Sequence, residues 1–249
     1  MNRTIAASQC IKPLQKRHSL KEPVRPEILI PSSIKEIDEV LGGFKAGTIF
    51  YTSGSDHLTR RLVYQLCITT YQTFKAASIF IDGGTTANPY TLARYARNHH
   101  LPLDEILSHV YISRAFTLYQ LTSLLTEHLE PLIQSKQPQT LIINAFPYLY
   151  QDADVTAHES RTLLKVSLER IRKLTRTYQL VTLLSAPFSH LTSRYETIQW
   201  PIVSEVDEHL HITVPYRCPQ VFFQNRQQSI TLTSYAKGQL SLPDFGMVM

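Results

Sequence analysis

Two short runs of β-branched and aromatic residues, Thr48-Ile-Phe-Tyr-Thr-Ser53 and Ala77-Ser-Ile-Phe-Ile-Asp82, flank a segment of helical period at Leu58–Thr73. A strand, a helix and a second strand in this order predict a crossover unit with parallel strands. The same alternation begins at about Ile28 and continues through most of the chain. It predicts an α/β fold in which helices flank a twisted, mainly parallel sheet.

The other predicted elements are equally short and regular. The strands are His109–Ser113, Thr140–Phe146 and Leu180–Ser185, followed by Leu210–Val214, Gln220–Phe223 and Ile230–Tyr235, which are expected to add an antiparallel edge. The helices are Ser33–Leu41, Pro89–Asn98, Leu118–Gln134 and Glu159–Tyr178. The sequence shows no repeat and no interdomain linker, so we expect one core domain at residues 28–249 after a basic arm at residues 1–27.

The composition excludes several classes of protein. Of the 249 residues, 43% are hydrophobic and 18% charged, which is typical of a globular chain and not of a disordered or fibrous one. The longest apolar runs are far shorter than the roughly 20 residues that span a bilayer. The three cysteines are widely spaced, so neither a disulfide framework nor a zinc site is indicated. These features favour a cytoplasmic protein without a membrane partner.

Most of the formal net charge of +5 comes from the N-terminal arm. Each phosphate that a cation neutralises adds affinity for a nucleic acid, so this arm is a candidate DNA contact. The alternative is a solvated terminus without that role. The cations singled out are Lys12, Lys16, Arg17 and Lys21.

A resemblance to a known family rests on two stretches. The first is Ile34-Lys-Glu-Ile-Asp-Glu-Val-Leu-Gly-Gly-Phe-Lys-Ala-Gly47, and the second runs from Phe80-Ile-Asp82 through Leu101-Pro-Leu-Asp-Glu-Ile-Leu107 to Val110-Tyr-Ile-Ser-Arg-Ala-Phe116. Their order and spacing resemble the ATPase core of the RecA/RadA recombinase superfamily, and most closely its archaeal RadA type. The resemblance implies a RecA-like P-loop NTPase core, with nucleotide and DNA sites on loops at the carboxyl ends of the strands.

The phosphate loop of that family is altered here. The pattern G-x-x-x-x-G-K-[ST] becomes Gly54-Ser-Asp-His-Leu-Thr-Arg-Arg61, so Thr59 replaces the second glycine, Arg60 the lysine and Arg61 the magnesium-binding hydroxyl. With a one-residue deletion, Thr59 falls at the lysine and Arg60 at the hydroxyl. Asp56 would also repel a phosphate. The alternative is that Arg60 and Arg61 bind phosphate as a pair.

The acidic positions are altered as well. By resemblance, a catalytic glutamate would follow Asp82 by two residues, where this chain has Gly84, and the Walker B aspartate corresponds to Asn144. Ser185 begins the segment where the family has a polar γ-phosphate sensor. Asp82 remains as a carboxylate at a strand end, with turn capping as its alternative role. These losses predict a pseudo-ATPase that needs no cofactor, with ATP and Mg²⁺ bound only if the atypical loop still functions.

Two loops would face DNA by resemblance, at residues 147–160 and 186–205. The first has no Lys or Arg and the second has only Arg194. Their aromatic residues could stack on bases or pack on their own domain. These residues are Tyr148, Tyr150, Tyr195 and Trp200.

The helix at residues 161–176 has a cationic outer face, which is the other candidate DNA surface beside the arm. Its cations include Arg161, Lys165, Arg172 and Arg176. A solvated face is the alternative. Two histidine pairs, at residues 99–100 and 209–211, lack a cysteine or acidic partner in the sequence pattern and are interpreted as isolated surface residues, not as metal ligands.

The leading hypothesis is a catalytically degenerate RecA/RadA-like accessory factor in DNA recombination or repair, which binds DNA, a recombinase-like partner or a second copy of itself. One alternative is a DNA-dependent ATPase with an atypical phosphate loop. Another is a KaiC-like regulatory scaffold that does not act on DNA.

Overall fold

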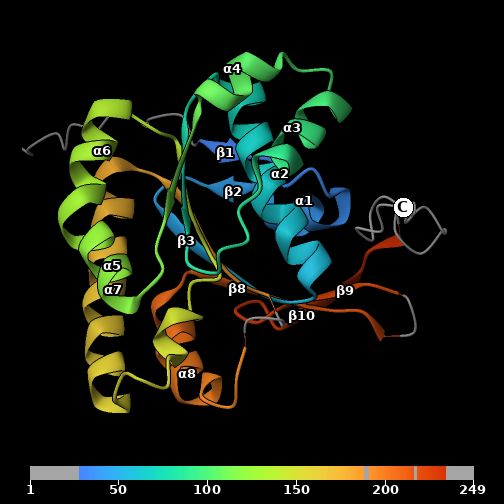
Figure 1. Ribbon diagram of the computed structural model, residues 1–249. Helices are drawn as coiled ribbons and strands as arrows, with labels where there is room; N and C mark the ends of the chain where they lie inside the picture. The colour runs from blue at the N-terminus through green and yellow to red at the C-terminus, as the bar shows by residue number, and fades with distance from the viewer. Residues whose placement is uncertain (1–27, 188–190, 216–217, 234–249) are drawn as a thin grey trace, which may run out of the picture.

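An eight-stranded sheet forms the centre of the computed structural model, which describes residues 28–187, 191–215 and 218–233 (Figure 1). The strand order is β10-β9-β8-β3-β7-β6-β4-β5. Neighbours from β8 to β5 are parallel, whereas β9 is antiparallel to both of its neighbours, β8 and β10. The bounds are β3 (Thr48–Gly54), β4 (Ser78–Asp82), β5 (Val110–Arg114), β6 (Thr140–Asn144), β7 (Val181–Pro187), β8 (Glu208–Thr213), β9 (Gln220–Phe223) and β10 (Gln228–Thr231). The predicted α/β class is confirmed.

Helices cover both faces of this sheet (Figure 1). One apolar core lies under α1 (Lys35–Leu41), α2 (Asp56–Phe74), α3 (Pro89–Asn98) and α4 (Leu103–Ser108). The other lies under α5 (Leu118–Ser123), the π-helical turn η1 (Leu124–His128), α6 (Leu129–Lys136), α7 (Ala157–Tyr178) and α8 (Tyr195–Glu205). Because both faces are covered, β4, β6 and β7 are buried at every residue, which explains their nearly continuous apolar sequences.

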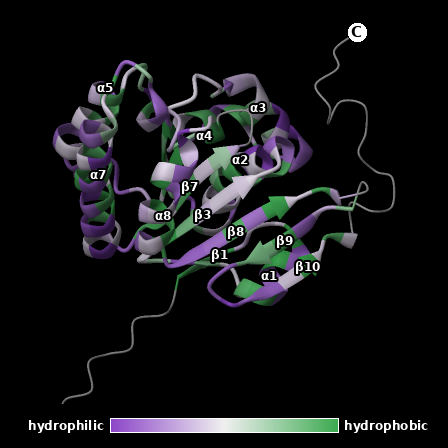
Figure 2. Cartoon of the chain, turned by 90° about the horizontal axis from the view of Figure 1, so that it is seen from below, coloured by the Kyte–Doolittle hydropathy of each residue, from purple (hydrophilic) through white to green (hydrophobic). Residues whose placement is uncertain are grey.

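Helix α7 shows how the sequence pattern positions a surface helix. Leu164, Leu168 and Ile171 recur at intervals of three and four and are buried, so they form one apolar stripe. The remaining positions are largely hydrophilic, as the purple residues on α7 in Figure 2 show. Thr156 caps the helix, and its side chain accepts a hydrogen bond from the Glu159 N–H.

Several elements differ from the sequence-based expectation. Helix α2 begins at Asp56, two residues earlier than predicted, and α8 lies inside the expected loop at 186–205. The predicted helix 118–134 contains the π turn η1, which directly precedes the turn with Pro131. A short 3-10 helix, η2 (Leu149–Gln151), and a small sheet of β1 (Leu29–Ile30) and β2 (Phe44–Lys45) were not expected. Within the part of the chain that the structure describes, no helix is long and apolar enough to cross a membrane.

Candidate functional site

The segment that corresponds to the phosphate loop is folded as a helix. Strand β3 ends at Gly54 and α2 begins at Asp56, so Ser55 alone connects them. The Thr59 N–H already donates to the Ser55 carbonyl oxygen at 2.9 Å. A phosphate loop needs an irregular backbone whose N–H groups surround the anion. That backbone geometry is missing between Gly54 and Arg61.

Gly54 has a reason to be glycine that involves no phosphate. Its φ is +112°, and a Cβ atom at this position would lie 2.0 Å from the carbonyl oxygen of Ile212 on β8. The same oxygen accepts a hydrogen bond from the Ser55 N–H at 2.9 Å. Glycine is therefore required by the close approach of two backbones.

The last three residues of the altered motif, Thr59, Arg60 and Arg61, lie in different environments. Thr59 is fully buried, and its hydroxyl has no hydrogen-bond partner within the described residues. Arg60 is exposed and faces the Asp56 carboxylate at 3.9 Å. Arg61 lies near His99. Burial is the main cause that lowers the pKa of the His99 imidazole, and the charge of Arg61 lowers it further. Consecutive helical residues differ in direction by about 100°, so Arg60 and Arg61 do not form a phosphate clamp.

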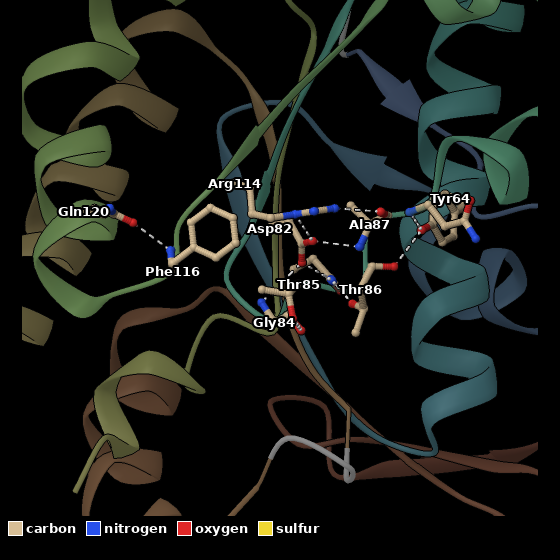
Figure 3. Close-up of polar contacts among 11 residues, drawn as sticks. Tyr64, Asp82, Gly84, Thr85, Thr86, Ala87, Arg114, Phe116 and Gln120 are labelled. Atoms are coloured by element: carbon tan, nitrogen blue, oxygen red, sulfur yellow. Dashed lines mark hydrogen bonds and ion pairs between the residues drawn. The ribbon is translucent and has the colours of Figure 1, made fainter. Parts of the chain in front are cut away.

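Asp82 is fully buried at the end of β4 and already has four partners (Figure 3). Its Oδ1 accepts from the Gly84 N–H at 3.2 Å and from Asn144 Nδ2 at 3.0 Å. Its Oδ2 accepts from the Ala87 N–H at 2.7 Å and faces Arg114 Nε at 3.4 Å. The carboxylate thus caps the turn after β4, which is the alternative that the sequence left open.

Asn144 extends this network across the sheet. Its Nδ2 also donates to Thr86 Oγ1 at 2.8 Å, and its Oδ1 accepts from the Ser185 hydroxyl at 2.9 Å. The Ser185 oxygen in turn accepts from the Ala145 N–H at 3.0 Å. An aspartate at position 144 would present a second carboxylate to Asp82, whereas the amide donates to it.

We call the connected residues Arg114, Asp82, Asn144 and Ser185 the Asp82 chain. They stand at the carboxyl ends of β5, β4, β6 and β7, which are neighbours in the sheet. Arg114 also clamps the loop after β4, because its Nη2 donates to the Ala87 carbonyl oxygen at 2.9 Å. A general base must be able to reach a substrate proton, and a metal ligand needs an available lone pair. The internal bonds of the Asp82 chain occupy the groups that would serve these roles.

A second chain of side chains joins β3, β8 and Gln224, which directly follows β9, and we call it the Ser53 chain. The Ser53 hydroxyl lies 2.8 Å from His209 Nε2 and 2.9 Å from His211 Nδ1, and His209 Nδ1 lies 2.5 Å from Gln224 Oε1. Since the amide oxygen can only accept, His209 Nδ1 donates to it, and His209 Nε2 accepts from Ser53. His211 Nδ1 then donates to the Ser53 oxygen.

The interpretation of His209 and His211 as surface residues was wrong. His209 is 2% exposed and His211 is half-buried. Burial lowers the pKa of both imidazoles, that of His209 to about 4. Both rings are therefore neutral at pH 7. The described residues contain no group of three or more His, Cys, Asp or Glu side chains arranged to hold a metal ion.

The two loops expected to face DNA are tied to each other. Arg194 donates to the carbonyl oxygens of Asp152 and Val155. Gln151 Oε1 accepts from the Thr192 N–H at 2.6 Å and from its hydroxyl at 2.9 Å. The only cation of the second loop is thus used inside the protein.

The four aromatic residues of these loops divide into two pairs. Tyr150 is buried, and the Tyr195 hydroxyl lies 2.6 Å from that of Tyr51 on β3, so these two rings pack on their own domain. Tyr148 and Trp200 are 40% and 72% exposed. The second pair is therefore the exposed one.

The predicted cations of α7 also divide. Arg172 contacts the Glu205 carboxylate at 2.5 Å, and Arg176 contacts the Gly47 carbonyl oxygen at 2.5 Å and the Asp207 carboxylate, so both hold neighbouring segments. Arg161 donates to the Ala157 carbonyl oxygen at 3.1 Å, and Lys165 is an exposed partner of Glu169 at 3.9 Å. The predicted arm cations Lys12, Lys16, Arg17 and Lys21 lie outside the described residues.

Sequence reasoning identified Asp82 and Asn144 but missed Arg114, Ser53 and Gln224 as members of the two chains. Arg114 directly follows a predicted strand, and the alternation of His209 and His211 on one strand placed both on one face. These signals could have pointed to the carboxyl edge of the sheet, but not to the partners that pair there.

Comparison with known proteins assigns the chain to a family. No curated protein matches the chain. Residues 25–188 match the family model described as Rad51, a RecA-family ATPase domain, and they include β3, α2, β4, β5, β6 and β7. Since this match covers more than half of the 249 residues, the chain belongs to the Rad51 family.

Proposed function

We propose that this protein is a catalytically degenerate member of the Rad51 family, an accessory factor in DNA recombination or repair that binds a recombinase-like partner through the β5 edge of its sheet. The observation that carries the proposal is an open sheet edge beside a mostly apolar hollow, and the bonds of Asp82 to its own chain support it.

Strand β5 ends the sheet, and no described strand pairs with its outer edge. Ile112, in the middle of β5, is 39% exposed. On the other face of β5, between the sheet and the η1–α6 segment, lies a mostly apolar hollow of about 40 Å³, lined by Ile79, Ile81, Ser113, Leu124, His128, Leu129 and Leu132. An added strand would gain main-chain hydrogen bonds from such an edge, and one apolar side chain could enter the hollow. The resemblance implies that the family assembles in this manner.

Two features of the segments that correspond to the nucleotide site support a loss of catalysis. The helical fold of Asp56–Arg61 and the occupied Asp82 carboxylate both act against a bound Mg²⁺–nucleotide. No separate observation favours a DNA-dependent ATPase or a KaiC-like scaffold over the accessory role.

The nucleotide test uses purified full-length protein and labelled ATP with Mg²⁺, with a RadA-type recombinase as the positive control. We expect no binding at millimolar ATP and no hydrolysis. Hydrolysis that disappears in Arg60→Ala would overturn the proposal in favour of an ATPase with an atypical loop.

The partner test captures a RadA-type recombinase, or a differently tagged copy of this chain, on the immobilised protein. We expect capture by the wild type and its loss in Ile112→Glu, because a charged side chain on the edge prevents strand addition. Val166→Glu is the matched control, since Val166 is 41% exposed but lies on α7. Failure of the wild type to capture either protein would contradict the proposal, and so would unaltered capture by Ile112→Glu.

A further inference from the structure

Helix α3 has two faces of different chemistry. Leu92, Ala93 and Ala96 are buried, and Leu92 and Ala96 belong to the core under α2. The opposite face carries Tyr90, Arg94 and Arg97, which are spaced by four and three residues and so lie on one side of the helix. All three are exposed, and Tyr90 is 86% exposed, the highest value among the large hydrophobic residues that the structure describes.

Helix α2 carries a further cation near the start of α3. The Tyr64 and Tyr95 rings stack with centroids 6.0 Å apart, and the Tyr64 hydroxyl accepts from the N–H of Asn88, the N-cap of α3, at 2.8 Å. Arg60 precedes Tyr64 by one helical turn and is exposed. It therefore lies near the end of α3 that carries Tyr90.

Helix α3 itself carries a positive charge. Helix α3 contains no Asp or Glu, and within the described residues Arg97 forms no ion pair. On the neighbouring helices, Asp56 faces Arg60, and the Glu105 carboxylate accepts from the Tyr71 hydroxyl. Because a phenol is a neutral donor, Glu105 keeps its charge, so Asp104 and Glu105 are both exposed acids of α4 in this region.

We infer that Tyr90, Arg94 and Arg97 form a binding surface for a single-stranded nucleic acid, which we call the α3 face. Guanidinium groups bind phosphate through directed hydrogen bonds, and an exposed aromatic ring stacks on an unpaired base. A duplex satisfies only the first of these contacts, because its bases are already stacked on one another. From Tyr90 to Arg97 the helix rises about 10 Å, so the face holds a short stretch of the strand.

This surface differs from those that the resemblance implied. In the loops at 147–160 and 186–205, Arg194 forms hydrogen bonds within the protein. On α7, Arg172 and Arg176 form ion pairs with neighbouring segments. The inference rests on the proposed function, of which the α3 face is the nucleic-acid contact. It uses no residue of the β5 edge, so the two surfaces can be tested separately.

The test measures fluorescence anisotropy of a labelled thirty-nucleotide oligothymidylate with the full chain across a salt series. We expect Arg94→Ala/Arg97→Ala to weaken binding about tenfold or more at low salt and to reduce the slope of log affinity against log salt by about 1.4, or 0.7 for each lost phosphate contact. We expect Tyr90→Ala to weaken binding to the single strand at least about fivefold and to leave binding to a duplex unchanged.

The control is Lys35→Ala/Lys45→Ala, which removes the same charge from α1 and β2. Arg161→Ala/Lys165→Ala tests the competing face of α7. The inference is overturned if the α3 variants bind like the wild type, if the α7 variant alone loses binding, or if the wild type does not bind the oligonucleotide. In each case, capture of the recombinase through the β5 edge decides separately whether the proposed function stands.

Discussion

The Asp82 chain and the Ser53 chain close two halves of the same sheet edge by different chemistry. The first is centred on a fully buried carboxylate that faces a guanidinium and accepts from two backbone N–H groups and an amide. The second consists of a hydroxyl, two imidazoles and an amide, all neutral at pH 7. Charge-assisted bonds make the first half strong, whereas the second depends on imidazoles that burial keeps neutral. The two halves should therefore respond differently to substitution and to acid.

The largest loss of stability is expected at the backbone contact between β3 and β8, next to the Ser53 chain. Gly54→Ala places a Cβ 2.0 Å from the Ile212 oxygen, so β3 and β8 must separate. We expect a loss of more than about 4 kcal/mol of unfolding free energy, measured by urea denaturation. Gly42→Ala is the matched control, because Gly42 also has a positive φ, of +74°, but no atom within 4 Å of the added Cβ. It should cost about 1 kcal/mol. Equal losses in both variants would show that the approach of β8 is not what requires glycine.

Next in size is the removal of the buried charge. Asp82→Ala leaves the Arg114 guanidinium and the Gly84 and Ala87 N–H groups without their acceptor, so we expect a loss of about 3–4 kcal/mol. The exposed Asp154 gives the control, since Asp154→Ala should change stability by less than about 0.5 kcal/mol. A loss near 1 kcal/mol for Asp82→Ala would mean that the Asp82 chain is not the stronger of the two.

The third prediction concerns pH. The pKa of His209 is lowered from 6.5 to about 4 by burial, so the unfolded chain binds a proton more readily than the folded one. Stability is thus lost as the pH falls from about 6.5 towards 4, by about 3 kcal/mol in all. Urea denaturation at a series of pH values should show this loss, with a smaller one in His209→Gln. The exposed His128 provides the control, because His128→Gln should follow the wild type. An unchanged pH profile in His209→Gln would rule out the assignment.

The smallest effect is expected at the end of the Asp82 chain. Ser185→Ala removes the donor to Asn144 Oδ1 and the acceptor of the Ala145 N–H but no charge, so we expect a loss of about 2 kcal/mol. Ser204→Ala, at an exposed position of α8, should be neutral within about 0.5 kcal/mol. A loss as large as that of Asp82→Ala would show that the chain acts as a single unit and not as a carboxylate with peripheral partners.

Much of the fold was readable in the sequence because the central strands are buried on both faces. The predicted strand Thr140–Phe146 and helix Pro89–Asn98 are close to β6 and α3, since long apolar runs and a clear helical period leave few alternatives. Helix α8 was missed because its segment contains Pro201 and lacks a strong amphipathic pattern. Its position depends on tertiary contacts such as the Tyr51–Tyr195 pair.

The candidate site was predictable in part. The turn-capping alternative for Asp82 follows from local chemistry, since a carboxylate at a strand end commonly accepts from the next N–H groups. The pairing of Asp82 with Asn144 and Arg114 depends on strand order, because these residues are 62 and 32 positions away in the sequence. The pairing of Ser53 with His209 is longer still, at 156 positions. Local patterns carry no information about such neighbours.

The helical start of α2 also determines what would be needed to build a phosphate loop at this position. The eight residues Gly54–Arg61 equal the family's phosphate loop in length, so no insertion is needed to restore the motif. However, Leu58 and Thr59 are buried within the first turns of α2, and rebuilding an irregular loop would expose them to water. Exchanging Thr59, Arg60 and Arg61 for the family's residues would restore the sequence of the motif but not its backbone conformation. A phosphate loop at this position would therefore require the first turns of α2 to unwind, and an exchange of three side chains would not supply that change of backbone.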